Sequence, residues 1–168
     1  MAVLPIKVLG DAVLRQKAKR VSQVDGSIRR LVEDMIDTMR DAGGVGLAAP
    51  QVGVPLRVVV IAMPEEEEVI ALINPEIVKR SGERRLTEGC LSVPGYWAEV
   101  TRSLSVTAKG RDLQGRQVRI KAEDDLLAQA LEHELDHING VLYIDHLESL
   151  DELRETAPAP EEEVSAEL

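Results

Sequence analysis

Two histidines four residues apart constrain this chain more than any other feature. They stand in His133-Glu134-Leu135-Asp136-His137, inside a stretch whose apolar residues recur with a helical period. On a helix, positions i and i+4 lie on one face a turn apart, so both imidazoles can reach one metal ion. Glu134 projects to the side, close enough to exchange a proton with water at that ion. The pattern therefore predicts a C-terminal helix that binds a metal.

Two imidazoles need a third protein ligand if one position on the metal is to stay open for water. Gly140 fits a protease pattern with a third histidine, but Tyr143 stands where that histidine is required. A glutamate after the helix would be the ligand in a zincin-like endopeptidase, and only the short chain beyond His137 could supply it. Cys90 is the upstream candidate, although a free cysteine is most often a small buried hydrophobe. A thiolate ligand would explain both motifs at once.

The chain has 168 residues, of which 44% are hydrophobic, and this is enough for one globular domain. Because phenylalanine is absent, we expect the core of that domain to be aliphatic. The net charge of −10 lies mostly in the C-terminal region. We therefore expect a catalytic domain over residues 1–147 and an acidic, disordered tail over 148–168. This charge argues against DNA as a partner. The sequence lacks a secretory signal and a long apolar run, and it has one cysteine, so we expect no membrane association and a cytoplasmic location.

Periodicity outlines an α+β fold of short, mostly antiparallel strands around the C-terminal helix. An amphipathic helix is predicted after Asp25 and ends at Gly43-Gly44, while the second helix begins at the acidic run Glu123-Asp124-Asp125 and ends at Gly140. Strands are predicted over 57–63, 69–73, 100–109 and 116–122, and a hairpin over 76–80 and 83–87 turns at Ser81-Gly82. The glycine-rich segment 44–51 fits neither period.

Three motifs in order resemble the peptide deformylase family: GVGLAAPQ at 44–51, EGCLS at 88–92 and HELDH at 133–137. The resemblance runs from about Leu4 to about Leu147. It implies a small α+β fold and removal of the formyl group from N-formylmethionyl nascent peptides, with release of formate. Glu132 departs from the glutamine that many members have there, and we expect its charge near the helix surface.

The resemblance also implies a role for each matching residue. Cys90, His133 and His137 become the metal ligands, and Glu134 becomes the general base and acid. Gln51 and the backbone N–H of Leu91 become the donors that stabilise the oxyanion.

The resemblance implies Fe²⁺ as the metal, with Zn²⁺, Ni²⁺ or Co²⁺ as substitutes, whereas the ligand types alone would favour zinc. Its partners are N-formylmethionyl peptides, and the ribosome is a candidate partner. For the methionine side chain we expect an apolar pocket formed by Val45, Leu126 and Ala130, with the backbone at Val45-Gly46 crowding the acyl side. His146 is expected to be a surface residue. Two alternatives stay open: a zincin-like endopeptidase and a metal-free, degenerate binding module.

Overall fold

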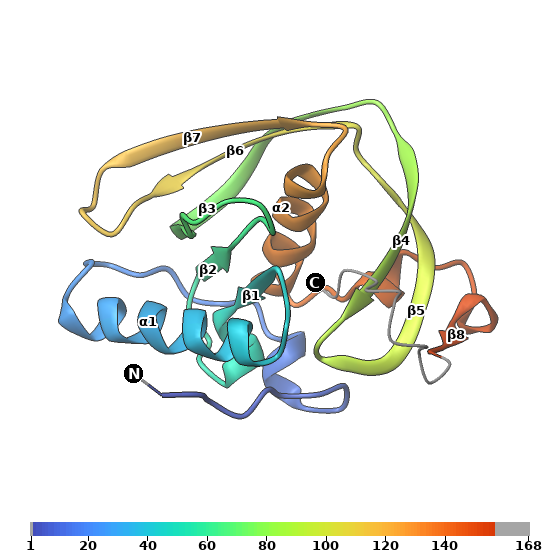
Figure 1. Ribbon diagram of the computed structural model, residues 1–168, viewed down its shortest axis with the longest axis horizontal. Helices are drawn as coiled ribbons and strands as arrows, with labels where there is room; N and C mark the ends of the chain where they lie inside the picture. The colour runs from blue at the N-terminus through green and yellow to red at the C-terminus, as the bar shows by residue number, and fades with distance from the viewer. Residues whose placement is uncertain (1, 157–168) are drawn as a thin grey trace.

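The computed structural model describes residues 2–156, in which strands β1 to β7 lie between two α-helices and short 3-10 helices (η) connect some of the elements (Figure 1). In chain order they are η1 (Ala12–Arg15), α1 (Gly26–Asp41), β1 (Gly46–Ala48), η2 (Ala49–Val52), β2 (Val58–Ile61), β3 (Ile70–Ser81), β4 (Arg84–Cys90), β5 (Val93–Arg102), β6 (Ser105–Arg111), β7 (Gln117–Glu123), α2 (Leu126–His137), η3 (Tyr143–His146), η4 (Leu150–Glu152) and β8 (Arg154–Glu155). Among these residues no helix is both long and apolar enough to cross a membrane.

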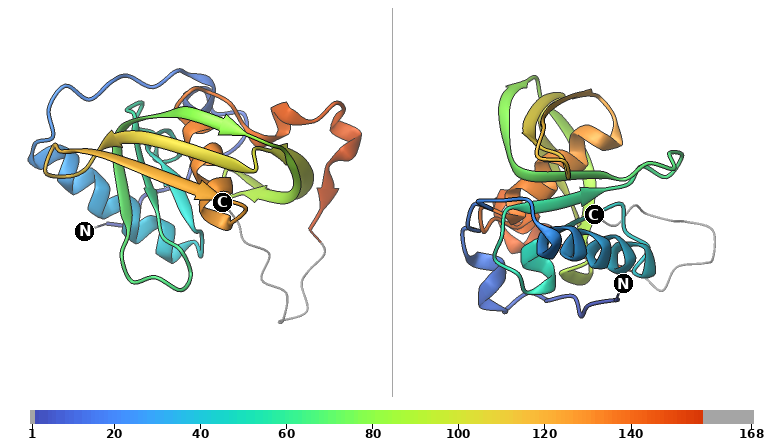
Figure 2. Two further views of the ribbon diagram at one scale, coloured as in Figure 1. Left: turned by 90° about the horizontal axis from the view of Figure 1, so that it is seen from above. Right: turned by 90° about the vertical axis from the view of Figure 1, so that its left-hand side faces the viewer.

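The strands form two antiparallel sheets, which confirms the predicted α+β class. One sheet has the order β1-β2-β3-β6-β7, and the other has the order β4-β5-β8. Within β2, Val58 and Val60 pack with α1, whereas Val59 and Ile61 pack in the cluster that contains the apolar residues of α2. Successive side chains of a strand point to opposite faces, so the two helices cover opposite faces of the larger sheet (Figures 1 and 2). A strand buried on both faces explains why residues 57–63 are almost continuously apolar.

Both helices begin at the predicted places because an aspartate caps each one. The Asp25 carboxylate accepts the backbone N–H groups of Ser27 and Ile28 at the start of α1. The Asp125 carboxylate accepts the N–H of Ala128 at the start of α2. These bonds satisfy amide donors that a helix leaves without an internal partner. The second cap fixes where the helix starts, and therefore where both histidines face.

The predicted hairpin at Ser81-Gly82 is wrong. Residues 70–81 form one strand, β3, which pairs with β6, while β4 pairs with β5. Gly82 has φ +68° and marks a corner, where a Cβ atom would lie 2.8 Å from the Cβ of Leu104. The predicted strand 100–109 is likewise interrupted at 103–104, where the chain returns to the larger sheet. Two paired segments therefore cross together from one sheet to the other.

The actual turn of this long bent hairpin is at Leu91-Ser92, between the paired residues Cys90 and Val93. No strand was predicted over residues 93–99, so the first part of β5 was missed. The register shifts between Gly89, which pairs with Trp97, and Cys90, which pairs with Val93. Residues 94–96 therefore form a bulge, where a proline interrupts no required ladder bond. The bulge places Cys90 at the tip of the hairpin.

The tail begins as ordered structure, so the expectation of disorder from residue 148 is wrong for residues 148–156. Strand β8 pairs with Tyr96 and Trp97 of β5. Leu147 and Leu153 pack against the cluster that contains Cys90. Residues 157–168, the other part of the predicted tail, lie outside the described residues. The division between a domain at 1–147 and a separate tail stays a prediction.

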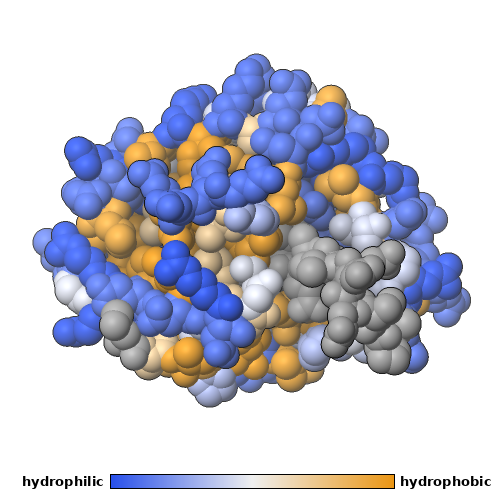
Figure 3. All heavy atoms as spheres, in the orientation of Figure 1, coloured by the Kyte–Doolittle hydropathy of each residue, from blue (hydrophilic) through white to orange (hydrophobic). Residues whose placement is uncertain are grey.

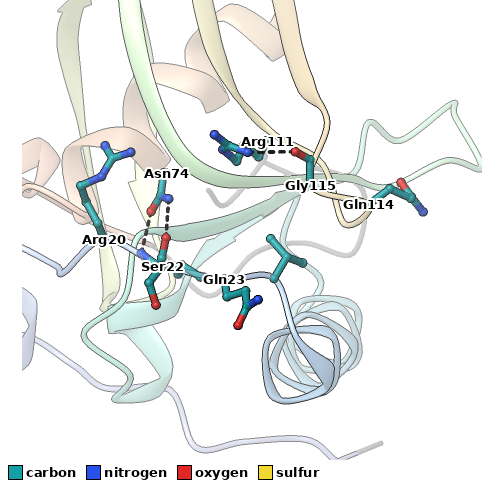
Figure 4. A pocket seen from close by; sticks show the side chains of 9 residues that line it. Arg20, Ser22, Gln23, Asn74, Arg111, Gln114 and Gly115 are labelled. Atoms are coloured by element: carbon teal, nitrogen blue, oxygen red, sulfur yellow. Dashed lines mark hydrogen bonds between the residues drawn. The ribbon is translucent and has the colours of Figure 1, made fainter.

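Asn74 joins the segment before α1 to strand β3. It has φ +52°, and its side-chain amide accepts the N–H of Val21 and donates to the carbonyl of the same residue (Figure 4). Short polar side chains are among the few that tolerate this left-handed conformation. Arg20 and Arg111 line the same polar hollow. On the face in Figure 3, apolar residues gather between the β6–β7 hairpin and α1.

Truncation separates the two parts of the predicted tail. A chain ending at Leu147 loses η4 and β8, so Leu153 no longer covers the cluster around Cys90. We expect its melting temperature to fall by several degrees, which corresponds to about 1–2 kcal/mol in a chain of this size. A chain ending at Thr156 should melt like the full-length protein in thermal unfolding followed by circular dichroism. Equal melting of both truncated chains would show that the ordered segment does not stabilise the fold.

Candidate metal centre

Three side chains from two elements converge at one buried point. Cys90 lies at the end of β4, while His133 and His137 are a turn apart on α2. The Sγ atom of Cys90 is 3.3 Å from Nε2 of His137, and that nitrogen is 3.1 Å from Nε2 of His133. All three residues are buried, and they are the candidate metal-binding group found among residues 2–156. One thiol and two imidazoles so placed match the donor atoms that zinc and related divalent metals use in proteins.

The orientation of His133 is fixed by a buried carboxylate. Its Nδ1 lies 2.7 Å from Oε2 of Glu88. Because an ionised carboxylate can only accept, Nδ1 carries a proton, and Nε2 faces Cys90 and His137. Glu88 and Cys90 stand two residues apart on β4, so both side chains leave the same face of the strand. The same strand therefore supplies a ligand candidate and the group that orients another.

Arg102 on β5 holds Glu88 in place. Its guanidinium donates to both carboxylate oxygens of Glu88 and to Oδ2 of Asp136, the latter at 2.7 Å. Burial raises the pKa of Glu88, but the contacts with His133 and Arg102 outweigh it and hold this pKa well below its usual value. Glu88 also accepts a hydrogen bond from Gln129 at 3.2 Å. A buried carboxylate with these partners stays ionised and keeps its geometry.

The pKa values of the two histidines are shifted in opposite directions. Burial lowers the pKa of His133, but Glu88, Glu134 and Cys90 together raise it well above the ordinary value. Burial and the nearby His133 lower the pKa of His137 well below the ordinary value. His137 is therefore neutral at physiological pH, which is the form that binds metals. The Nδ1 atom of His137 is buried without a hydrogen-bond partner among the described residues.

Glu134 is fully buried, and neither of its carboxylate oxygens has a hydrogen-bond partner among the described residues. Burial raises the pKa of Glu134 to about 7. A buried carboxyl group without polar partners is costly unless a polar group occupies the space beside it. The orphaned oxygens therefore fit a site built for a metal ion and water, and the raised pKa suits a group that takes and returns a proton near neutral pH.

Gly46 leaves the space that this carboxylate occupies. A Cβ atom built at Gly46 would lie 2.3 Å from Oε2 of Glu134 and 2.9 Å from its Cδ. Strand β1 thus passes directly against the carboxylate, which only a residue without a side chain permits. Gly46 was expected beside the acyl side of the substrate, and its contact with Glu134 was not foreseen.

Gln51 is held with its amide group toward Cys90. Its Oε1 accepts the N–H of Ala48 at 2.9 Å, while its Nε2 donates to Oγ of Ser92 at 3.1 Å and lies 3.7 Å from Sγ of Cys90. The carbonyl half anchors the side chain, so the N–H half faces the candidate metal centre. Leu91 lies in the turn that directly follows Cys90. The structure therefore brings both expected oxyanion donors to the same end of the hairpin.

The expected pocket residues belong to one apolar cluster. Val45 and Ala130 are buried in it, and the partly buried Leu126 packs against it. Met63 and Ile70, which flank the acidic loop after β2, pack against the same cluster and were not foreseen. The hollow of Figure 4 lies elsewhere and contains none of the expected site residues. Side-chain chemistry, rather than surface shape, locates this centre.

One expectation about α2 needs correction, and the expectation about His146 is confirmed. Glu132 is buried rather than near the surface: it accepts the Ser103 N–H at 2.7 Å and pairs with Arg80 at 3.2 Å. His146 is exposed, as expected, and its Nε2 lies 2.8 Å from Oδ2 of Asp136, a contact that was not foreseen. Glu88 and Arg102 were missed as orienting groups. The signal for Glu88 was its position two residues before Cys90, whereas no sequence spacing pointed to Arg102.

A buried HExxH helix with a cysteine from a neighbouring strand defines the class of metal-dependent hydrolases. The comparisons with known proteins are consistent with this class. Residues 3–153 match the family model described as polypeptide deformylase. A peptide deformylase of Dehalococcoides mccartyi strain CBDB1 is 56% identical over 161 residues, covering 96% of each chain. A peptide deformylase of Thermomicrobium roseum is 49% identical and covers 98% of this chain and 97% of its own.

Solved structures agree with the sequence relatives. A crystal structure of a peptide deformylase from Legionella pneumophila has a TM-score of 0.86 and 48% identity, covering 90% of this chain and 89% of its own. A crystal structure of a peptide deformylase from Synechococcus elongatus in complex with actinonin has a TM-score of 0.85 and 43% identity, covering 90% of this chain and 82% of its own. The chain belongs to the peptide deformylase family.

Gly46→Ala tests the contact between β1 and Glu134. The added methyl group must displace the carboxylate, so we expect a loss of turnover of about tenfold or more, on the scale of a misplaced acid–base group. Metal content should stay near that of the unmodified protein because no ligand candidate is touched. Gly26→Ala is the control, since a Cβ atom there meets nothing within 4 Å. Unchanged turnover of Gly46→Ala would show that the position of Glu134 does not limit the reaction.

Proposed function

We propose that this chain is a metal-dependent hydrolase that removes the formyl group from N-formylmethionyl peptides and releases formate. One observation carries the proposal: a thiol and two imidazole nitrogens converge beside a fully buried carboxylate that has no hydrogen-bond partner among the described residues. This arrangement suits hydrolysis of an amide bond at a metal centre. Membership of the peptide deformylase family supports formylated peptides as the substrate class.

Cys90, His133 and His137 would hold one divalent metal ion. When bound, such an ion supplies a Lewis acid that polarises a carbonyl group and lowers the pKa of water. The three residues fit this task because the hydrogen bond to Glu88 already orients His133, and burial keeps His137 neutral. We propose Fe²⁺ as the metal, with Zn²⁺, Ni²⁺ or Co²⁺ as substitutes, since a site with one soft sulfur and two nitrogen ligands accepts each of these ions.

Glu134 would handle the proton in both halves of the reaction. With its pKa near 7, the carboxylate takes a proton from the attacking water and later gives it to the leaving amine. The N–H of the Gln51 side chain and the backbone N–H of Leu91 would donate to the oxygen of the formyl group as negative charge develops there. Preorganised donors of this kind need no reorientation during the reaction, and the loss of one typically lowers the rate about a hundredfold.

The apolar cluster beside α2 would accept the methionine side chain of the substrate. Val45, Leu126 and Ala130 are our candidates for its walls, with Met63 and Ile70 at its edge. On the acyl side, β1 at Gly46 runs directly against Glu134, so the space beside the reacting carbon is narrow. Formyl has only hydrogen at that position, whereas a peptide carbonyl has a whole residue. This crowding supports a deformylase over a zincin-like endopeptidase.

Neither alternative function is favoured by a specific observation. An endopeptidase of the zincin type needs a ligand beyond α2, but the described candidate group takes its third member from β4. A metal-free binding module would not need the ion pair that orients His133. We further propose a cytoplasmic location and action on nascent chains at the ribosome, without DNA as a partner. The negative net charge and the family membership support this assignment.

Substitutions at Cys90 and Glu134 separate binding of the metal from catalysis. Cys90→Ala removes a ligand candidate, so the purified protein should contain far less metal in elemental analysis and lose activity. Glu134→Gln keeps the shape of the side chain and should retain the metal, but we expect turnover to fall at least about a hundredfold. The control is Ser105→Ala on β6, away from the centre. Full metal content and activity in Cys90→Ala would refute the ligand assignment.

The substrate is tested with short peptides on protein prepared without oxygen. Formyl-Met-Ala-Ser should release formate rapidly, and the rate on formyl-Ala-Ala-Ser should be lower by about tenfold or more, because a smaller side chain fills the pocket incompletely. Acetyl-Met-Ala-Ser should react far more slowly, since the added methyl group meets the crowded acyl side. Glu134→Gln serves as the control for each peptide. Efficient cleavage inside an unformylated peptide, without formate release, would instead indicate an endopeptidase.

A further inference from the structure

A chain of hydrogen bonds runs from a candidate metal ligand to an exposed histidine outside the three motifs. His133 contacts Glu88, Glu88 pairs with Arg102, and Arg102 donates to Asp136. The last contact joins Oδ2 of Asp136 to Nε2 of His146 at 2.8 Å. Exposure rises along this path from 1% for the His133 side chain to 18% for Asp136 and 36% for His146. His146 is therefore the outer end of the network that orients the metal centre.

The charges inside the network explain why its outer end matters. Two carboxylates, those of Glu88 and Asp136, share the single guanidinium of Arg102. Glu88 has further donors in His133 and Gln129. Oδ2 of Asp136 contacts Arg102 and Nε2 of His146, and that nitrogen also lies 3.4 Å from the guanidinium of Arg102. Because an ionised carboxylate can only accept, Nε2 of His146 is the second donor to Asp136. Without the second donor, Asp136 gains by turning toward water, since a partly buried carboxylate needs hydrogen bonds to stay ionised.

Movement of Asp136 would be transmitted to His133. Arg102 is almost completely buried and makes its charged contacts with these two carboxylates, so losing the Asp136 contact frees one end of the guanidinium. Glu88 would then hold a guanidinium that can rotate, and the hydrogen bond that sets the ring of His133 would lose its fixed partner. Groups that orient a metal ligand affect metal affinity without touching the metal.

We propose that His146 is a positioning residue of the metal centre, which acts by holding Asp136 against Arg102. The proposal rests on the metal-binding function proposed above. His146 sits in η3, which also carries the buried Tyr143, whose ring stacks on His133 at 6.3 Å between centroids. The same short element thus contacts the ligand directly through Tyr143 and indirectly through His146.

The test compares His146→Leu, which keeps the bulk of the ring without an N–H group, with His146→Gln, which keeps an N–H donor. Both variants are loaded with Co²⁺, and two properties are measured: the visible absorption spectrum of the bound ion and its rate of loss to a chelator. We expect His146→Leu to lose Co²⁺ about threefold to tenfold faster, below the roughly 10–100-fold typical of a group that contacts a ligand directly. Its spectrum should shift, and His146→Gln should restore both properties.

Arg15→Gln is the matched control, because it removes the ion pair with Asp145 in the same η3 segment without touching Asp136. It should behave like the unmodified protein. Rates and spectra of His146→Leu that match those of the control would overturn the proposal, as would a glutamine variant as impaired as the leucine variant. If the unmodified protein binds no Co²⁺, the proposed function itself fails, which separates the two results.

Discussion

The buried ion pair between Arg102 and Glu88 is the interaction on which the rest of the site depends. Both side chains are almost inaccessible to water, at 2% and 0% exposure, and a charge so placed is tolerated only with a well-matched partner. The pair joins β5 to β4, and Glu88 then contacts His133 on α2. Arg102 also donates to Asp136 on the same helix, and Gln129 of the helix donates to the carbonyl of Thr87 on β4. These contacts together hold Cys90, two residues along β4 from Glu88, opposite the two histidines.

This constraint also explains the order of the chain through the two sheets. One segment runs from β3 into β4, and the other runs from β5 into β6. The two segments pair with each other, β3 with β6 and β4 with β5, and they cross between the larger and the smaller sheet at Gly82 and Leu104. The crossing carries Cys90 to the tip of the hairpin, under the helix that the larger sheet supports. Because α2 packs on the larger sheet, while the cysteine comes from the smaller one, the metal centre lies where the two meet. The fold thus brings the three ligand candidates together.

The sequence predicted the local part of this picture. Helical periodicity and capping aspartates indicated both helices, and the spacing of His133 and His137 indicated a shared face. The family motifs identified Cys90, Gln51 and Glu134; Gln51 contacts Cys90, and Glu134 lies against Gly46 of the glycine-rich motif. What failed was long-range pairing: Ser81-Gly82 looks like a hairpin turn, but strand partners depend on contacts that no short window contains. Pro94-Gly95 concealed the first part of β5 because a bulge tolerates residues that normally end a strand.

The burial of charged residues was also not predicted from the sequence, for a related reason. Glu132 and Arg102 look like surface residues, and only tertiary partners such as Ser103 and Glu88 make their burial possible. A charged side chain is assigned to the surface from sequence because burial without a partner is too costly. The partners lie far along the chain, so the sequence contains no local sign of them. The residues that tune the centre were therefore harder to foresee than those that form it.

The central claim is that one sulfur and two imidazole nitrogens hold the metal, and X-ray absorption at the metal edge tests it most directly. On protein loaded with Zn²⁺, the account predicts one sulfur scatterer at about 2.3 Å and two imidazole nitrogens at about 2.0 Å from the metal. The sulfur contribution should vanish in Cys90→Ser. A spectrum of the unmodified protein that shows only nitrogen and oxygen scatterers would contradict the account.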